Sequence, residues 1–292
     1  MHIHLVHTSN KKGEIKMNIQ LGLNKGFDQA RKIIYSYFPE NKIKIEEVEY
    51  KSRRFFNITF LRNRFSKDFY SRIANLILEL ILNIYSEDII NKYINANLRE
   101  FKPEERKEIG EISKKLLLDK DNFIIEKQYI NNQIRKYICE MPYISIDGFI
   151  MFRLKDIDLI INLVVDKGIE EFTAKKEYKE FISILKYFVN VQEPKYDLVN
   201  LVFNGDDYIL LDKNGKVIDK NFFEDIVVQL ESEKISQEDL LISTLIVLAP
   251  KNLIVHLDEK TKDSDTIKVI TDVFEDRVYF CMGCERCKDN IK

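Results

Sequence analysis

The C-terminal part of the chain reads Asn252-Leu-Ile-Val-His256-Leu257, then Ser264 to Phe274, then Arg277-Val-Tyr-Phe-Cys281-Met-Gly-Cys284-Glu-Arg-Cys287. The first stretch is typical of an apolar strand, the second has the spacing of a helix, and the third begins as another strand. A strand, a helix and a strand with short links form a βαβ crossover, which predicts that the two strands are parallel. Parallel strands end at the same edge of a sheet, where binding sites gather.

Three of the four cysteines lie within seven residues at that edge. Each Cys-x-x-Cys step lets two sulfur atoms converge on one ion, and Gly283 eases the turn between the first two cysteines. His256 lies near the end of the neighbouring strand, so its imidazole is expected within reach of the cysteine loop. The predicted metal ligands are therefore Cys281, Cys284, Cys287 and His256, and together they would complete a tetrahedral Cys₃His zinc site.

Two other interpretations of the cysteines stay open. An iron–sulfur cluster is the alternative cofactor, because the three cysteines have the spacing that opens bacterial ferredoxin motifs, although the fourth Cys-Pro of that motif is absent. A thiol-based redox enzyme or sensor acting through Cys281 and Cys284 is the alternative function, since Arg286 and Lys288 could lower a neighbouring thiol pKa. Plain thiols without a ligand are the remaining interpretation.

The composition limits the function classes. The 292 residues are 45% hydrophobic and 32% charged with a net charge of −2, which indicates a globular protein without general affinity for polyanions. An export signal and an apolar run of about 20 residues are not found, so we expect a cytoplasmic protein with reduced cysteines. A glycine-rich phosphate loop or a nucleophile motif is not found either, so no catalytic residue is predicted.

The fold class predicted is α+β, in three parts. Residues 1–65 form an N-terminal α/β element, residues 66–194 a helical domain, and residues 195–292 an α/β domain with a small mixed sheet that ends in the βαβ unit. Cys139, on the last turn of a predicted helix, is expected to be a small buried hydrophobic residue. The other predicted elements are a strand at Ile3–Thr8, a helix at Asn24–Phe38, a hairpin of Lys44–Tyr50 and Arg54–Leu61, helices from Ser66 to about Met141, a long helix pair between Leu159 and Gln192, a hairpin of Leu198–Phe203 and Tyr208–Leu211, and helices at Phe222–Leu230 and Leu240–Ala249.

The N-terminal hairpin offers a second alternative function. Basic residues from Arg53 to Arg64 alternate with aromatic ones, a composition that can bind single-stranded nucleic acid. The aromatic residues also have the spacing of a hydrophobic core and the charges cluster at strand ends, which favours a structural role.

Four motifs in the second half of the chain stand together: Ile146-Asp-Gly-Phe149 with Phe152-Arg-Leu-Lys155, Lys176-Glu-Tyr-Lys-Glu-Phe181 through Leu185-Lys-Tyr-Phe-Val189 and Gln192-Glu-Pro194, Asp239-Leu-Leu-Ile-Ser-Thr244 to Ala249-Pro250, and Cys281-Met-Gly-Cys284-Glu-Arg-Cys287. From about Pro142 onward the chain thereby resembles the YtxC-like family of sporulation proteins from spore-forming, low-GC Gram-positive bacteria. The resemblance implies a link to endospore formation and carries over no catalytic residue, ligand or partner. The leading hypothesis is a non-enzymatic protein whose metal-bound cysteine loop presents a surface to a protein partner.

Overall fold

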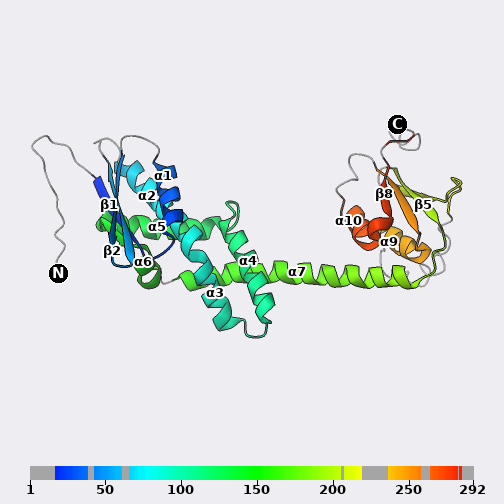
Figure 1. Cartoon of the computed structure of the whole chain (residues 1–292), viewed down its shortest axis with the longest axis horizontal. Helices are drawn as coiled ribbons and strands as arrows, with labels where there is room; N and C mark the ends of the chain where they lie inside the picture. Colours follow the sequence, from blue (N-terminus) through cyan, green and yellow to red (C-terminus); the bar gives the residue numbers. More distant parts are fainter. Residues whose placement is uncertain are drawn as a thin grey trace, which may run out of the picture. The chain divides into compact units, whose positions relative to one another are not determined.

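The computed structural model describes residues 17–38, 43–60, 66–154, 156–204, 207–218, 236–257, 264–281 and 283–284. The chain forms two compact units, Met1–Thr173 and Ala174–Lys292, each built around its own hydrophobic core (Figure 1). The described residues contain two separate four-stranded sheets together with many helices, which confirms the predicted α+β class. Among the described strands, those of the N-terminal part therefore do not join the C-terminal sheet.

The sheet of the first unit has the strand order β2-β3-β1-β4. Its strands are β1 (Met17–Leu23), β2 (Ile43–Tyr50), β3 (Arg53–Phe60) and β4 (Tyr143–Ser145). The predicted hairpin is confirmed as the antiparallel pair β2–β3, while β1 pairs antiparallel with β3 and parallel with β4. Side chains alternate between the two faces of a strand, and the register places Ile19 opposite Ile58 and Leu21 opposite Phe56 on the buried face.

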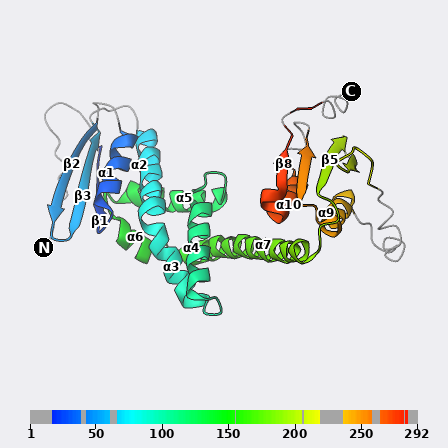
Figure 2. The same cartoon turned by 45° about the vertical axis from the view of Figure 1, so that its right-hand side comes forward.

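Helices α1 and α2 lie beside this sheet (Figures 1 and 2) and share its core. The helical elements of the first unit are α1 (Phe27–Tyr37), α2 (Ser66–Leu80), the π-helical turn η1 (Ile81–Tyr85), α3 (Ser86–Asn97), α4 (Pro103–Leu118), α5 (Ile124–Glu140), α6 (Ile146–Phe152) and the first part of α7 (Ile157–Val191). The expectation that Cys139 is buried is wrong, because the side chain is exposed. Ile130, Ile134 and Ile138 face the core at intervals of four residues, and the residue after Ile138 turns about 100° away from them.

Helix α7 runs without interruption for 35 residues, whereas the sequence predicts a pair of helices over this range. The boundary between the two compact units falls inside it, between Thr173 and Ala174, and not at Pro194. Likewise, residue 65 does not separate two units, since strands β1 and β3 share one core with helices α2 to α6. The strands of the first unit need these helices to cover their apolar face.

The sheet of the second unit has the order β6-β5-β7-β8. Its elements are β5 (Leu198–Asn204), β6 (Asp207–Leu211), α9 (Gln237–Leu248), β7 (Asn252–His256), α10 (Asp265–Phe274), the 3₁₀ turn η4 (Glu275–Arg277) and β8 (Val278–Phe280). Strands β7 and β8 are parallel and joined through α10, which confirms the predicted βαβ unit. The predicted strand Ile3–Thr8 and the predicted helix Phe222–Leu230 lie outside the described residues.

The two faces of this sheet differ in character. Val199, Leu201, Leu253 and Val255 point into the core formed with α7, α9 and α10. The intervening residues on β5 and β7 point to the opposite face, because side chains alternate along a strand. Those residues are Asn200, Val202, Ile254 and His256.

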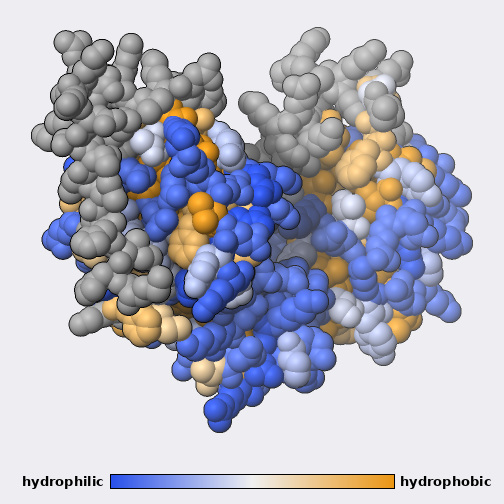
Figure 3. All heavy atoms as spheres, turned by 60° about the vertical axis from the view of Figure 1, so that its left-hand side comes forward, coloured by the Kyte–Doolittle hydropathy of each residue, from blue (hydrophilic) through white to orange (hydrophobic). Residues whose placement is uncertain are grey.

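The surface of the protein is largely hydrophilic on the face shown in Figure 3, with smaller apolar patches between the polar residues. Throughout the described ranges, no helix combines the length and the apolar character that crossing a membrane requires.

Candidate metal centre

Two of the predicted ligands, His256 and Cys281, are held at the same edge of the sheet. Val255 on β7 is paired in parallel register with Phe280 on β8. The backbone N–H of Cys281 then donates to the carbonyl oxygen of Val255 at 2.9 Å, so the ladder of hydrogen bonds continues into the first cysteine. His256 is the last residue of β7. The βαβ connection therefore brings a nitrogen ligand and a sulfur ligand to neighbouring strand ends.

The ligand atoms of His256, Cys281 and Cys284 all lie within 4.8 Å of one another. The distance from His256 Nδ1 to Cys284 Sγ is 3.4 Å. In a tetrahedral zinc site, with Zn–S of about 2.3 Å and Zn–N of about 2.0 Å, a nitrogen and a sulfur ligand lie about 3.5 Å apart. The observed separation fits two ligands of one ion. Cys287, the fourth predicted ligand, lies outside the described residues.

The loop between the two described cysteines depends on Gly283. Its φ is +108°, in the region that favours glycine, and in the described residues beyond its two neighbours no atom lies within 4 Å of the position that a Cβ would take. The requirement for glycine is therefore one of backbone conformation and not of space. This conformation lets the chain reverse so that the sulfur atom of Cys284 returns toward His256.

The three candidate ligands differ in burial. His256 is 5% exposed, whereas Cys281 and Cys284 are half-buried. The imidazole thus forms the inner side of the cluster, and the two sulfur atoms lie nearer to solvent. An ion could reach this site from the surface without an opening of the core.

Asn200 is a buried member of the site that the sequence analysis does not predict. It is 5% exposed, and its Oδ1 lies 3.2 Å from His256 Nε2. A polar residue in the middle of the apolar strand Leu198–Asn204 is the sequence signal that could have identified it, because a buried amide requires hydrogen-bond partners. Which partner it meets depends on the pairing of β5 with β7, which the sequence does not state.

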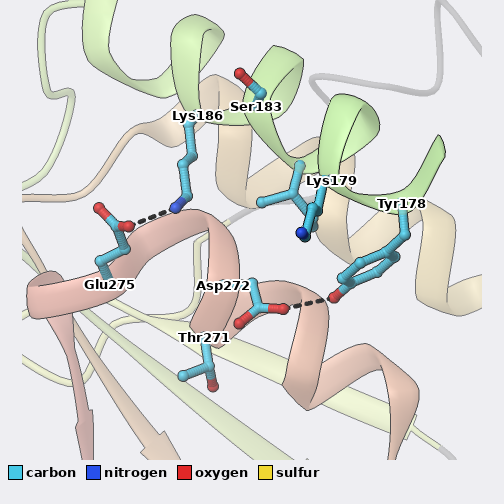
Figure 4. A pocket seen from close by; sticks show the side chains of 8 residues that line it. Tyr178, Lys179, Ser183, Lys186, Thr271, Asp272 and Glu275 are labelled. Atoms are coloured by element: carbon cyan, nitrogen blue, oxygen red, sulfur yellow. Dashed lines mark hydrogen bonds and ion pairs between the residues drawn. The ribbon is translucent and has the colours of Figure 1, made fainter. Parts of the chain in front are cut away.

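A separate pocket of about 380 Å³ lies between α7 and α10 (Figure 4). Tyr178 donates its hydroxyl hydrogen to Asp272 Oδ2 at 2.7 Å, and Lys186 forms an ion pair with Glu275. Burial, together with this hydrogen bond and the charge of Asp272, raises the pKa of Tyr178 to about 12. Tyr178 is therefore a neutral donor at pH 7. These two pairs join α7 to the end of α10, as in an ordinary helix–helix contact.

The basic residues of the N-terminal hairpin have partners within the first unit. Arg53 forms a two-pronged ion pair with Asp147, and Arg54 pairs with Glu49 while its guanidinium lies 4.8 Å from the ring centre of Phe27. Arg62, Arg64 and Phe65 lie outside the described residues. The contacts that are described support a structural role for this hairpin, and nucleic-acid binding stays a prediction.

Comparison with known proteins identifies one family. A model of the YtxC-like family matches residues 71–279, a range that includes Asn200 and His256 and ends two residues before Cys281. A Bacillus subtilis (strain 168) protein named "Uncharacterized protein YtxC" is 25% identical over 158 residues, which are 52% of this chain and 53% of that protein. The alignment therefore spans about half the length of the relative. No solved structure is significantly similar to the chain.

Proposed function

Because the chain belongs to the YtxC-like family, we propose that it is a non-enzymatic protein of endospore formation whose C-terminal cysteine loop binds a zinc ion. The observation that supports this proposal is the convergence of His256, Cys281 and Cys284 within 4.8 Å. The sporulation link comes from the family resemblance, and the zinc site from the geometry. The cytoplasm is the compartment that suits reduced cysteines of this kind.

The ligand set favours zinc over the alternative cofactor. Thiolate sulfur and imidazole nitrogen are the ligands of structural zinc sites, and Cys287 is the predicted fourth ligand. In a [4Fe–4S] cluster, by contrast, each cysteine binds a different iron atom, so the cysteine sulfur atoms stand farther apart than the ligands of a single ion. Three ligand atoms within 4.8 Å support one ion.

The proposed role of the ion is to fix the outer edge of the C-terminal sheet. Strand β8 has three residues and pairs only with β7 in the order β6-β5-β7-β8 of the described strands. Tyr279 is 53% exposed and Phe280 is 46% exposed, so apolar burial contributes little to holding this strand. A zinc ion would join the loop after β8 to the end of β7, and the rigid loop would present its surface to a protein partner.

Metal analysis of the full chain, purified without a histidine tag, tests the site. We expect about one equivalent of zinc in the wild-type protein, since a preformed set of soft ligands binds zinc stoichiometrically. Cys281→Ser and Cys284→Ser should each lose most of it. Cys139→Ser is the matched control: the same chemical change at an exposed cysteine of the first unit should leave the zinc content unchanged.

Two results would contradict the proposal. A wild-type protein with less than about half an equivalent of zinc or iron does not hold a stoichiometric metal. Zinc that stays bound in both Cys281→Ser and Cys284→Ser must be held elsewhere in the chain. Iron with acid-labile sulfide in place of zinc would support the cluster that the same cysteines were predicted to hold as an alternative.

The same geometry supports a thiol redox function as the second candidate. The sulfur atoms of Cys281 and Cys284 lie within 4.8 Å of each other. These two thiols could give two electrons and two protons to a disulfide of another molecule, which forms a Cys281–Cys284 disulfide and leaves that molecule with two thiols. Mass spectrometry of the metal-free protein after treatment with glutathione disulfide would detect it. Without a Cys281–Cys284 disulfide under those conditions, the redox function is excluded.

A further inference from the structure

We infer that Asn200 is a positioning residue that holds His256 in the tautomer with hydrogen on Nε2, so that the metal is bound through Nδ1. The inference rests on the proposed zinc site and adds to it a residue that does not touch the ion. It also specifies which ring nitrogen faces the metal.

The amide of Asn200 has only one favourable orientation. Its Nδ2 lies 3.3 Å from the carbonyl oxygen of Asp212, which can only accept hydrogen bonds. If the amide were rotated by 180°, Oδ1 would face that carbonyl oxygen, and two acceptors would be placed against each other. The NH₂ group of Asn200 must therefore point to Asp212, and Oδ1 must point to His256.

The carbonyl oxygen of Asp212 is itself fixed by a tight turn. The backbone N–H of Gly215 donates to it at 3.1 Å, and Gly215 has a φ of +82°. The carboxylate of Asp212 accepts from the backbone N–H of Asn214 at 2.8 Å and of Lys216 at 2.9 Å. Such Asx-type bonds make the turn rigid. The position of the acceptor that orients Asn200 is thus determined by local backbone structure.

The orientation of Asn200 then decides the state of His256. Oδ1 of Asn200 is an acceptor only, so the Nε2 atom 3.2 Å away must carry a hydrogen. In the neutral imidazole the other nitrogen, Nδ1, is then the one with a lone pair. Nδ1 is also the nitrogen that lies 3.4 Å from Cys284 Sγ, on the side of the cysteine cluster. Hydrogen bonds from a ligating histidine to such a partner fix its ring and its tautomer.

The strand register explains why these two residues meet. Val202 on β5 is paired with His256 on β7, and Asn200 is two residues before Val202. Residues two apart on a strand point to the same face, so Asn200 and His256 are diagonal neighbours on one face of the parallel pair β5–β7. Both are 5% exposed. In this environment the hydrogen bond is shielded from water and cannot be replaced by solvent.

Nuclear magnetic resonance of the wild-type protein tests the tautomer directly. Two-bond ¹H–¹⁵N correlation spectra show which ring nitrogen carries hydrogen and which binds zinc, and His256→Gln identifies the signals. We expect hydrogen on Nε2 and zinc on Nδ1. Zinc bound through Nε2 would overturn the inference and leave the zinc site intact, whereas a wild-type protein without metal would overturn the proposed function.

Zinc affinity of variants tests the contribution of Asn200. Asn200→Leu has nearly the same size but cannot accept a hydrogen bond, and we expect its zinc affinity to fall by about 10–100-fold. Asn252→Leu is the matched control, because Asn252 also donates from its amide to a backbone carbonyl, that of Asp197, in the same sheet. It should change the affinity by less than about threefold. If Asn200→Leu folds, binds zinc as tightly as wild type and keeps hydrogen on Nε2, then Asn200 does not position His256.

Discussion

Gly26 shows how a single residue joins two elements of the first unit. It is the N-cap residue of α1, with a φ of +65° in the left-handed region. A Cβ at this position would lie 2.5 Å from Cγ2 of Ile84, which belongs to the π-helical turn η1. Glycine is therefore required here both by the backbone conformation and by the space beside Ile84.

We expect Gly26→Ala to lower the free energy of unfolding of the first unit by about 1–3 kcal/mol. The left-handed conformation costs alanine about 1 kcal/mol, and the contact with Ile84 adds the cost of overpacking. Urea unfolding followed by circular dichroism measures the change. Gly148→Ala in α6 is the control, because its Cβ would make only ordinary contacts of 3.4 Å with Ser145 Oγ, and alanine favours a helix. Equal destabilisation by both changes would contradict this account of Gly26.

The ion pair of Arg53 and Asp147 connects the N-terminal hairpin to the start of α6. Arg53 Nη2 lies 2.7 Å from Asp147 Oδ2 and Nη1 lies 3.0 Å from Oδ1, and Ser145 Oγ donates to the same carboxylate at 2.8 Å. Burial alone would raise the pKa of Asp147. The hydrogen bonds from Arg53 and Ser145 and the charge of Arg53 outweigh that effect, so the pKa is lowered.

This lowered pKa predicts a defined pH dependence. A carboxyl group whose pKa is lower in the folded state stabilises the fold above its unfolded pKa of about 4, and this stabilisation is lost as the pH falls through the lowered value. We therefore expect Asp147→Asn to lower the free energy of unfolding by about 1 kcal/mol at pH 7. The value is small because Arg53 is 38% exposed and solvent screens the ion pair. The difference in the free energy of unfolding between Asp147→Asn and wild type should be smaller at pH 3.

Urea unfolding at the two pH values provides the measurement. Asp28→Asn is the control, because Asp28 is 89% exposed in its ion pair with Arg31. We expect this change to alter the free energy of unfolding by only about a few tenths of a kcal/mol at either pH. A difference between Asp147→Asn and wild type that stays constant from pH 7 to pH 3 would show that the charge of Asp147 does not stabilise the fold.

The elements that the sequence predicts are those with local signals. The N-cap serine at Ser236 accepts a hydrogen bond from the backbone N–H of Asp239, and α10 begins in the same way at Ser264. Strand β1 is not predicted, although Ile19, Leu21 and Leu23 alternate, because its partner β3 lies more than 30 residues away. Long-range pairing is what makes such a stretch a strand.

The candidate site also contains one part that local sequence signals predict and one part that depends on long-range strand pairing. His256 and Cys281 come close because of the βαβ connection, and the sequence pattern of strand, helix and strand predicts this connection. The role inferred for Asn200 depends on which residue of β5 lies diagonal to His256. That depends on the register between two strands whose paired residues are 54 apart in the sequence, and no local pattern determines this register.

At the scale of the whole molecule, one helix belongs to both compact units. The residues of α7 before Ala174 contribute Ile160, Ile161 and Val164 to the first core, and those after it contribute Ile182 and Val189 to the second. Gly168 is not a break between two helices, as a glycine between two apolar stretches would suggest. It is the place where α7 passes close to α4, because a Cβ on Gly168 would lie 2.1 Å from Ser113 Oγ and 3.3 Å from the carbonyl oxygen of Ile109.

We expect Gly168→Ala to destabilise the first unit by about 1–3 kcal/mol and to leave the second unit unchanged, since the added methyl group overpacks only the contact of α7 with α4. Hydrogen-exchange mass spectrometry reports the two units separately through peptides of α4 and of β5. The double variant Gly168→Ala with Ser113→Ala should regain part of the stability that Gly168→Ala alone loses. Within the described part of the chain the Ser113 hydroxyl is buried without a hydrogen-bond partner, so its removal costs little.

Removal of zinc should perturb the second unit in place of the first. If the proposed site is correct, chelation should accelerate exchange in β7 and β8 and leave α4 unchanged, because the ion would hold only the edge of the second sheet. The two cores share no buried side chain in the described residues, so each perturbation should stay within its own unit. Faster exchange in β5 after Gly168→Ala, or in α4 after chelation, would mean that α7 couples the two units into one cooperative structure.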